Sequence, residues 1–367
     1  MQKRYQQGIS LLELMIALAL GLVLVAVAVQ MFISSQANLS LQRGLGDLQD
    51  NGLFGIDFIA KDLRKTNLGA SLPILDSNIA QGGIILSQYN IIGGDAQANN
   101  QINVLGLGAN EMSGTALLPG TSNFTGQKSD QLTIQYKTVQ NIYDDATFLK
   151  KINNGLTADE KTLVVGYDCE GGKIVLEDVA NQVYIVQRYL VKPIGNATSN
   201  SNNPNLALYC DAGRYQLTDV ESAYAATDPA KRTVNITGLN HNNQIVLRRV
   251  DHFRVLLGVA SGEYGQSENF RYMTLSDYQQ LTGNNLPKIR SVQLGLVIRS
   301  QDRIPAATNN QQTTFNILDL TAVSLMGGKD NYMRQVLTQT IALRNALGED
   351  LRVKAEQTTV TSEGETP

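Results

Sequence analysis

The stretch GISLLELMIALALGLVLVAVAV, residues 8–29, decides the fold of this chain because it contains the longest apolar run in the sequence. No polar side chain occurs from Leu14 to Val29, and residues 9–33 contain only three. As a helix, residues 9–33 would be about 37 Å long, whereas the hydrocarbon core of a bilayer is about 30 Å thick. The sequence therefore predicts a transmembrane helix over residues 9–33.

The residues beside this run indicate its orientation. Lys3 and Arg4 precede it, and basic residues stay on the cytoplasmic side, so the rest of the chain is expected on the far side of the membrane. No Ala-x-Ala cleavage site follows the run, which leaves an uncleaved signal anchor as an alternative. Glu13 points to more than an anchor, because a carboxylate costs about 2.5–3.5 kcal/mol at the bilayer centre. At headgroup level it would be solvated instead.

The segment around Glu13 closely resembles the class III signal of type IV pilins and type II secretion pseudopilins. The shared features are a short basic leader, Gly8, an apolar residue, and a glutamate four positions later that opens a long apolar helix. This chain has Ile9 where the family usually has Phe. The resemblance implies that a prepilin peptidase cleaves after Gly8, removes the leader 1–8, and methylates the new amine of Ile9.

The same resemblance gives Glu13 a role in assembly. It implies a salt bridge between the Glu13 carboxylate and the amine of Ile9, either within one subunit or between neighbours. An unpaired carboxylate is costly where the dielectric constant is low, so this pairing would also set the axial register of the subunits.

Residues 34–67 are expected to continue the helix into a globular head. The glycines at 44, 46, 52 and 55 each weaken a helix by about 1 kcal/mol relative to Ala, so this segment needs tertiary support or can bend. One helical face is apolar, and we expect it to pack on the head. Its residues recur at spacings of three and four: Leu41, Leu45, Leu48, Gly52, Ile56, Ile59 and Leu63.

The region 68–348 changes to short alternating runs separated by Gly, Asn and Asp, which predicts a β-rich head. Two subdomains, about 70–215 and 230–345, are one expectation, and residues 349–367 are predicted to be a disordered tail. The fold class is therefore α+β, with a long N-terminal helix packed on the head. Strands are expected over 132–136, 183–190, 253–259, 292–298 and 334–344, a hairpin over 206–217 with its turn at 211–213, and a short helix over 274–281.

Cys169 and Cys210 are the two cysteines of the chain. The first helix places them outside the cytoplasm, where disulfides persist. A bridge closing a loop of about 40 residues would contribute roughly 4 kcal/mol. We expect this disulfide, with two unpaired buried thiols as the alternative. Neither cysteine has a His or a second Cys at the spacing of a metal site.

Little else in the sequence predicts chemistry. The net charge is −3 with 30 basic and 33 acidic residues, so nucleic acid is not expected as a direct ligand. The motifs of metalloproteases, serine hydrolases and P-loop proteins do not occur, and we expect no enzyme activity, cofactor or metal. His252 is predicted to be exposed, on the outer face of a strand. Arg248, Arg249 and Arg254 form a small basic cluster, which is expected at a sheet edge or a subunit contact.

The head resembles the PilW group of minor pilins in short ordered patches up to about residue 345. These are the segments 129–136, 167–171, 208–210, 250–258, 289–299 and 333–345. The resemblance implies a structural protein that primes or caps the type IV pilus, at its tip, and supports twitching motility, with DNA uptake as a further expected role.

The resemblance also implies the location and partners of the protein. It would lie in the inner membrane with its head in the periplasm, and then join the pilus. The prepilin peptidase, other minor pilins, the major pilin and the inner-membrane assembly platform would be its partners. A J-type pseudopilin of type II secretion and a membrane-anchored adhesin at the pilus tip remain alternatives.

Overall fold

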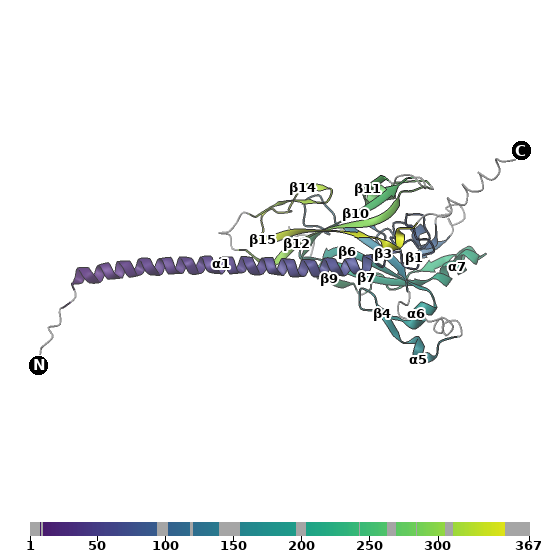
Figure 1. The fold of residues 1–367 in the computed structure, drawn as a ribbon, viewed down its shortest axis with the longest axis horizontal. Helices are drawn as coiled ribbons and strands as arrows, with labels where there is room; N and C mark the ends of the chain where they lie inside the picture. The colour runs from purple at the N-terminus through teal and green to yellow at the C-terminus, as the bar shows by residue number, and fades with distance from the viewer. Residues whose placement is uncertain are drawn as a thin grey trace.

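A single long helix carries a β-rich head at its C-terminal end in the computed structural model (Figure 1). The structure describes residues 8, 10–93, 102–117, 120–138, 155–195, 203–241, 243–262, 269–283, 285–304 and 311–348. The predictions for residues 1–7, for Ile9 and for the tail from residue 349 lie outside these described residues. Within them the fold is α+β, which confirms the predicted class.

Helix α1 runs without interruption from Leu11 to Leu63. The Ser10 side chain caps its first turn by accepting the N–H of Glu13 at 3.2 Å. The first part of α1 projects from the head with its apolar side chains exposed, and the part from Leu48 to Leu63 packs on the head. The helix ends four residues before the expected position 67, and turns follow it.

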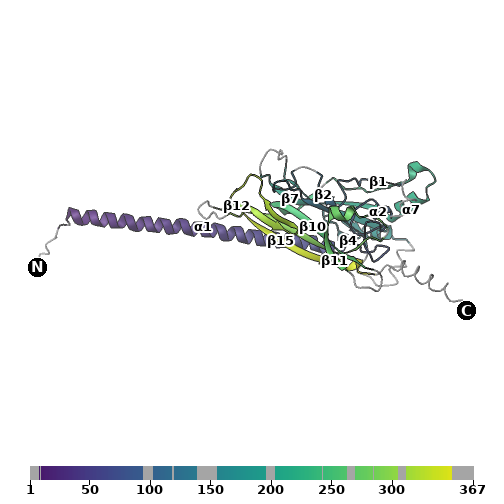
Figure 2. The same ribbon diagram turned by 90° about the horizontal axis from the view of Figure 1, so that it is seen from above.

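Two antiparallel sheets form most of the head (Figures 1 and 2). The five-stranded sheet has the order β2-β3-β6-β7-β9, and the four-stranded sheet has the order β11-β10-β12-β15. The first comprises β2 (Gly114–Thr115), β3 (Asp130–Lys137), β6 (Val183–Pro193), β7 (Leu206–Gln216) and β9 (Gln244–Arg248). The second comprises β10 (Val250–Ser261), β11 (Asn269–Thr274), β12 (Lys288–Arg303) and β15 (Tyr332–Ala342).

Shorter elements surround the two sheets. Strand pairs are β1 (Asn103–Leu105) with β8 (Thr233–Asn235), β4 (Val164–Tyr167) with β5 (Lys173–Val175), and β13 (Thr314–Ile317) with β14 (Leu320–Ser324). The short helices are α2 (Tyr89–Ile92), α5 (Ala158–Lys161), α6 (Leu176–Ala180), α7 (Leu217–Ala225), α8 (Leu275–Gln279), η1 (Pro229–Lys231) and η3 (Arg344–Ala346).

The two sheets share one hydrophobic core with α1. Leu208 of the first sheet, Phe253 and Leu294 of the second, and Ile59 of α1 belong to the same buried cluster. The chain passes from β9 of one sheet directly to β10 of the other through Arg249, which has a φ of 61°. Both sheets therefore contribute to one shared cluster with α1, and the division of the head into two subdomains stays a prediction.

Two glycines let α1 approach the sheets closely. A Cβ atom at Gly52 would lie 2.6 Å from Ile298 Cδ1 and would also overlap Leu337, and one at Gly55 would lie 2.8 Å from Leu247 Cδ1. Gly52 and Gly55 therefore serve close packing, and α1 is continuous where a bend was one expectation.

Most predicted strands are confirmed, but the hairpin predicted around residues 211–213 is wrong. Residues 206–216 form one strand, β7, and every residue of it pairs with β6. Asp211 faces Arg188 of β6 in an ion pair of 2.5 Å, and Gly213 lies under Leu239 with no room for a side chain. The Asp and Gly that suggested a turn are explained by these two contacts.

Candidate functional site

The start of α1 carries the residues predicted for processing and assembly. Gly8 is exposed and Ile9 lies outside the described residues. Glu13 is in the first helical turn and is exposed to solvent. Among the described residues no basic group contacts its carboxylate, although its backbone N–H is held by Ser10.

An exposed apolar surface follows Glu13 along α1. The most apolar 18-residue window of this helix has a mean hydropathy of 2.7, and none of it is buried. Of the helices described, it is the one that is long and apolar enough to cross a membrane. Exposing this much apolar surface to water is unfavourable, so this part of α1 requires a lipid or protein environment.

Cys169 and Cys210 form a disulfide, which confirms the predicted pairing over two free thiols. Their Cα atoms are 6.1 Å apart, and the bridge ties the loop between β4 and β5 to the centre of β7. Asp168 supports that loop by accepting the N–H of Gly172 at 2.7 Å. The loop is thus fixed on both sides of Cys169.

A buried carboxylate fastens the C-terminal part of α1 to the same region. Asp62 is 6% exposed and accepts the hydroxyl of Tyr189, on β6, at 2.6 Å. Burial and the neighbouring Asp62 raise the pKa of Tyr189 well above its usual value. The hydroxyl therefore remains the donor, and the contact fixes α1 against the five-stranded sheet.

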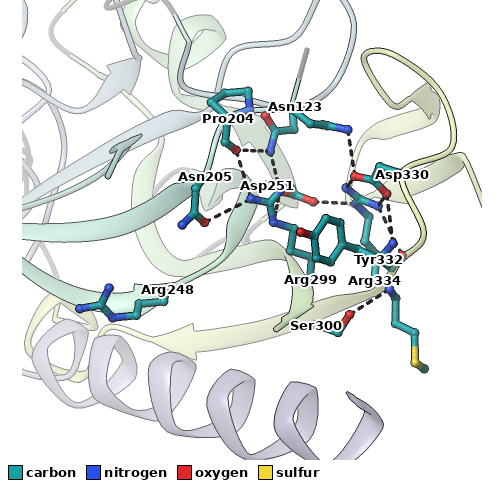
Figure 3. A network of polar contacts seen from close by, with 12 residues as sticks. Asn123, Pro204, Asn205, Arg248, Asp251, Arg299, Ser300, Asp330, Tyr332 and Arg334 are labelled. Carbon is teal, nitrogen blue, oxygen red and sulfur yellow. Dashed lines mark hydrogen bonds and ion pairs between the residues drawn. The ribbon is translucent and has the colours of Figure 1, made fainter. Parts of the chain in front are cut away.

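A second polar network lies where α1 enters the head, and we call this end of the head the entry pole (Figure 3). Asp251 is fully buried and accepts Nε of Arg334 at 2.6 Å and Nδ2 of Asn123 at 2.6 Å. Arg299 lies 3.7 Å from the same carboxylate. Burial would raise the pKa of Asp330, but the hydrogen bonds and charge of Arg334 lower it to about 2. The network joins β10, β12 and β15.

The prediction that His252 is exposed is wrong. Its side chain is fully buried, with Nδ1 at 3.0 Å from Ser122 Oγ and its ring edge-on to Phe124 at 5.8 Å. A register shift between Val250 and His252 disturbs the alternation of β10, and the segment around Ser122 covers the face expected to be open. Burial, followed by the charge of Arg254, lowers the pKa of His252 to about 4.

Of the three arginines expected to form one basic cluster, Arg248 and Arg249 line the same cleft, whereas Arg254 has partners of its own. Arg249 binds Asp47 of α1 at 2.9 Å, and Arg254 binds Asp319 at 2.6 Å. Arg248 is exposed at the end of β9, which is an edge strand as expected.

The entry-pole network was not found from the sequence. Its charged residues, Asp251, Arg299 and Arg334, lie in strands that carry other polar side chains as well, so no local pattern distinguishes them. Among the described residues there is no group of three His, Cys, Asp or Glu side chains that could hold a metal ion.

Two family models match parts of the chain. The sequence model of the type IV pilus-assembly protein W family matches residues 215–345, and that of the prokaryotic N-terminal methylation motif matches residues 3–29. No curated protein matches the chain significantly. A solved type IV-like pilin from Thermus thermophilus is similar over 82% of this chain and 96% of its own, with 11% identity and a TM-score of 0.33. That score is too low to support a conclusion about the head. The chain is therefore similar to type IV pilus-assembly protein W over residues 215–345, and the two family matches together support a type IV pilus minor pilin.

Proposed function

We propose that this minor pilin is cleaved between Gly8 and Ile9, is methylated on Ile9, and joins the pilus through α1 to prime or cap the fibre. The observation that carries the proposal is the first part of α1, where Glu13, which has no basic partner among the described residues, opens a fully exposed apolar helix. A neighbouring subunit would supply both the apolar cover and a counter-ion, the methylated amine of Ile9.

The membrane location before assembly follows from the same helix. Residues 9–33 would span the inner membrane, with the leader in the cytoplasm and the head in the periplasm. The Cys169–Cys210 disulfide supports this side of the membrane, because disulfides persist in oxidising compartments. The prepilin peptidase and the assembly platform would act on the chain there.

The size of the head supports a position at the pilus tip. Two sheets and their covering elements follow α1, whereas a repeating shaft position leaves little lateral room for a bulky head. At the tip the protein would contact other minor pilins and the major pilin, and would support twitching motility and DNA uptake through the pilus. We assign it a structural role without catalysis or a cofactor.

The decisive experiment replaces Glu13 by Ala, with Asp50→Ala as the matched control. Asp50 is an exposed carboxylate on α1 without a contact among the described residues. We expect normal cleavage of both variants, because the change leaves Gly8 and Ile9 intact. Incorporation of Glu13→Ala into sheared pili should fall at least tenfold, since a carboxylate left unpaired in lipid costs about 2.5–3.5 kcal/mol and pairing relieves this cost.

Two results would contradict the proposal. Normal incorporation of Glu13→Ala would show that assembly does not need the Glu13 carboxylate. A deletion strain that retains its pili but loses protein secretion would instead place the chain in a type II secretion pseudopilus.

A further inference from the structure

Strand β15 has a free edge, because it is the last strand of the four-stranded sheet and pairs with β12 on one side. Just after the strand, the N–H of Leu343 donates to the carbonyl of Arg290 at 2.9 Å, so these two residues form a hydrogen-bonded pair. Such pairs alternate along antiparallel strands. The odd-numbered residues of β15 therefore bond to β12, and the even-numbered ones point their N–H and C=O groups away from it. The outward residues are Val336, Thr338, Thr340 and Ala342.

This edge is accessible over most of its length. The outward backbone groups have no hydrogen-bond partner in the described part of the chain. Thr338, Thr340 and Ala342 are exposed to solvent. A strand edge with free donors and acceptors is a template for pairing with another strand.

Strand β15 also lacks the features by which proteins protect such edges. Residues 335–342 contain no charged residue, glycine or proline, and half of them are β-branched. The other edge strands are short or charged: β2 has two residues, β9 ends in the exposed Arg248, and β11 contains the exposed Arg271. Of the edges described, that of β15 is the one best suited to the addition of a strand.

The free edge is continuous with the exposed apolar surface of α1. A Cβ atom at Gly44 would lie 3.5 Å from Met333 Sδ and one at Gly52 would overlap Leu337, so β15 runs beside α1 in the same direction (Figure 1). The helical and strand segments between these contacts both span about 12–13 Å. Leu45, seven residues before Gly52 and on the same helical face, is 41% exposed. The apolar surface of α1 therefore extends past Leu45 to β15.

We propose that the free edge of β15 binds an extended strand of a neighbouring pilin, which adds to the four-stranded sheet through main-chain hydrogen bonds. Thr338 and Thr340 offer no counter-ion, so the added strand is uncharged beside them, with the hydroxyl or β-branched side chains that pair well with threonine. The inference rests on the proposed function, because it requires a neighbouring pilin that already covers α1.

The direction of the added strand excludes a second copy of β15. Antiparallel pairing is the more stable arrangement, so the added strand runs opposite to β15 and therefore toward the membrane. Pilins anchored by α1 in one membrane all point the same way, and their β15 strands are parallel to one another. The added strand is therefore a different strand, from another pilin.

The test is amide hydrogen exchange at single-residue resolution in detergent. It compares the full chain expressed alone with the full chain isolated in complex with co-expressed pilins. We expect the amides of Thr338 and Thr340 to exchange freely in the chain alone and about tenfold more slowly in the complex, because the added strand must detach before they exchange. The odd-numbered residues of β15 are an internal control, since β12 protects their amides in both samples.

The edge variant is Thr338→Lys with Thr340→Lys, which adds the side chains that natural edges use against pairing and leaves the bonds to β12 intact. The control, Thr233→Lys with Asn235→Lys, adds the same charge at the same spacing to exposed positions of β8, in the two-stranded sheet with β1. We expect the edge variant to lose the protection of its outward amides and to recover about tenfold less of the co-expressed pilins. The control should behave as the wild type does.

Equal exchange of Thr338 and Thr340 in the two samples would overturn the proposal, and so would protection retained by the edge variant. Protection in the chain alone that disappears when residues 349–367 are removed would make this chain's own C-terminal segment the occupant, and the neighbouring pilin would be excluded. A dimer of this chain cross-linked through β15 would exclude it equally. Entry into pili with unprotected outward amides would defeat this inference alone, whereas absence from pili would defeat the proposed function.

Discussion

The burial of His252 predicts a specific loss of stability in acid. Its pKa is lowered from 6.5 to about 4 in the folded head. The unfolded chain therefore binds a proton at a higher pH than the folded chain does, so the stability conferred by the neutral imidazole is complete above pH 6.5 and is lost as the pH falls toward 4. The resulting loss of unfolding free energy, relative to pH values above 6.5, is about 2 kcal/mol at pH 5 and about 3 kcal/mol below pH 4.

The perturbation is His252→Asn, which keeps a hydrogen-bonding group for Ser122 but does not titrate. The control is His241→Asn, at the other histidine of the chain, which is exposed. Arg254 and Asp319 also act on the imidazole, and both are retained in each variant.

The assay is urea unfolding of the full chain in detergent at pH 7 and pH 5, followed by near-ultraviolet circular dichroism of its 14 tyrosines. From pH 7 to pH 5, the free energy of unfolding of the wild type and of His241→Asn should fall by about 2 kcal/mol more than that of His252→Asn. An equal loss of unfolding free energy in all three proteins would refute the claim that His252 is buried in its neutral form.

Two further predictions concern stability. Replacing Cys169 and Cys210 together by Ala should lower the free energy of unfolding by about 4 kcal/mol, since the bridge joins residues 41 apart; the measurement is urea unfolding, and a loss below about 1 kcal/mol would contradict it. Asp251→Asn should cost about 3–5 kcal/mol in the same assay because it leaves the buried Arg334 without one of its two carboxylates. Asp302→Asn, on an exposed position of β12, should change stability by less than about 0.5 kcal/mol, and equal effects of the two Asp changes would exclude the network as the cause.

The long helix and most strands were predictable because their patterns are local. The apolar run at 9–33 needs no knowledge of the rest of the chain, and the alternation in 253–259 reflects one face of β10 packing on the core. The disulfide was predictable because the chain has two cysteines and its first helix predicts that both lie outside the cytoplasm, where disulfides persist.

The failures have tertiary causes. The turn expected at Asp211 is a strand because Arg188 of the neighbouring strand takes the carboxylate. His252 is buried because a segment more than 100 residues earlier in the chain, around Ser122, covers the outer face of the sheet. The entry-pole network draws on three strands, and no local pattern shows which charged side chains will meet.

The most direct test of the central claim is the intact mass of this protein recovered from sheared, purified pili. The account predicts one species that lacks residues 1–8, begins with a methylated Ile9 and carries the Cys169–Cys210 bridge. Recovery of a chain that still carries its first eight residues in otherwise normal pili would contradict it, and so would the absence of the protein from those pili.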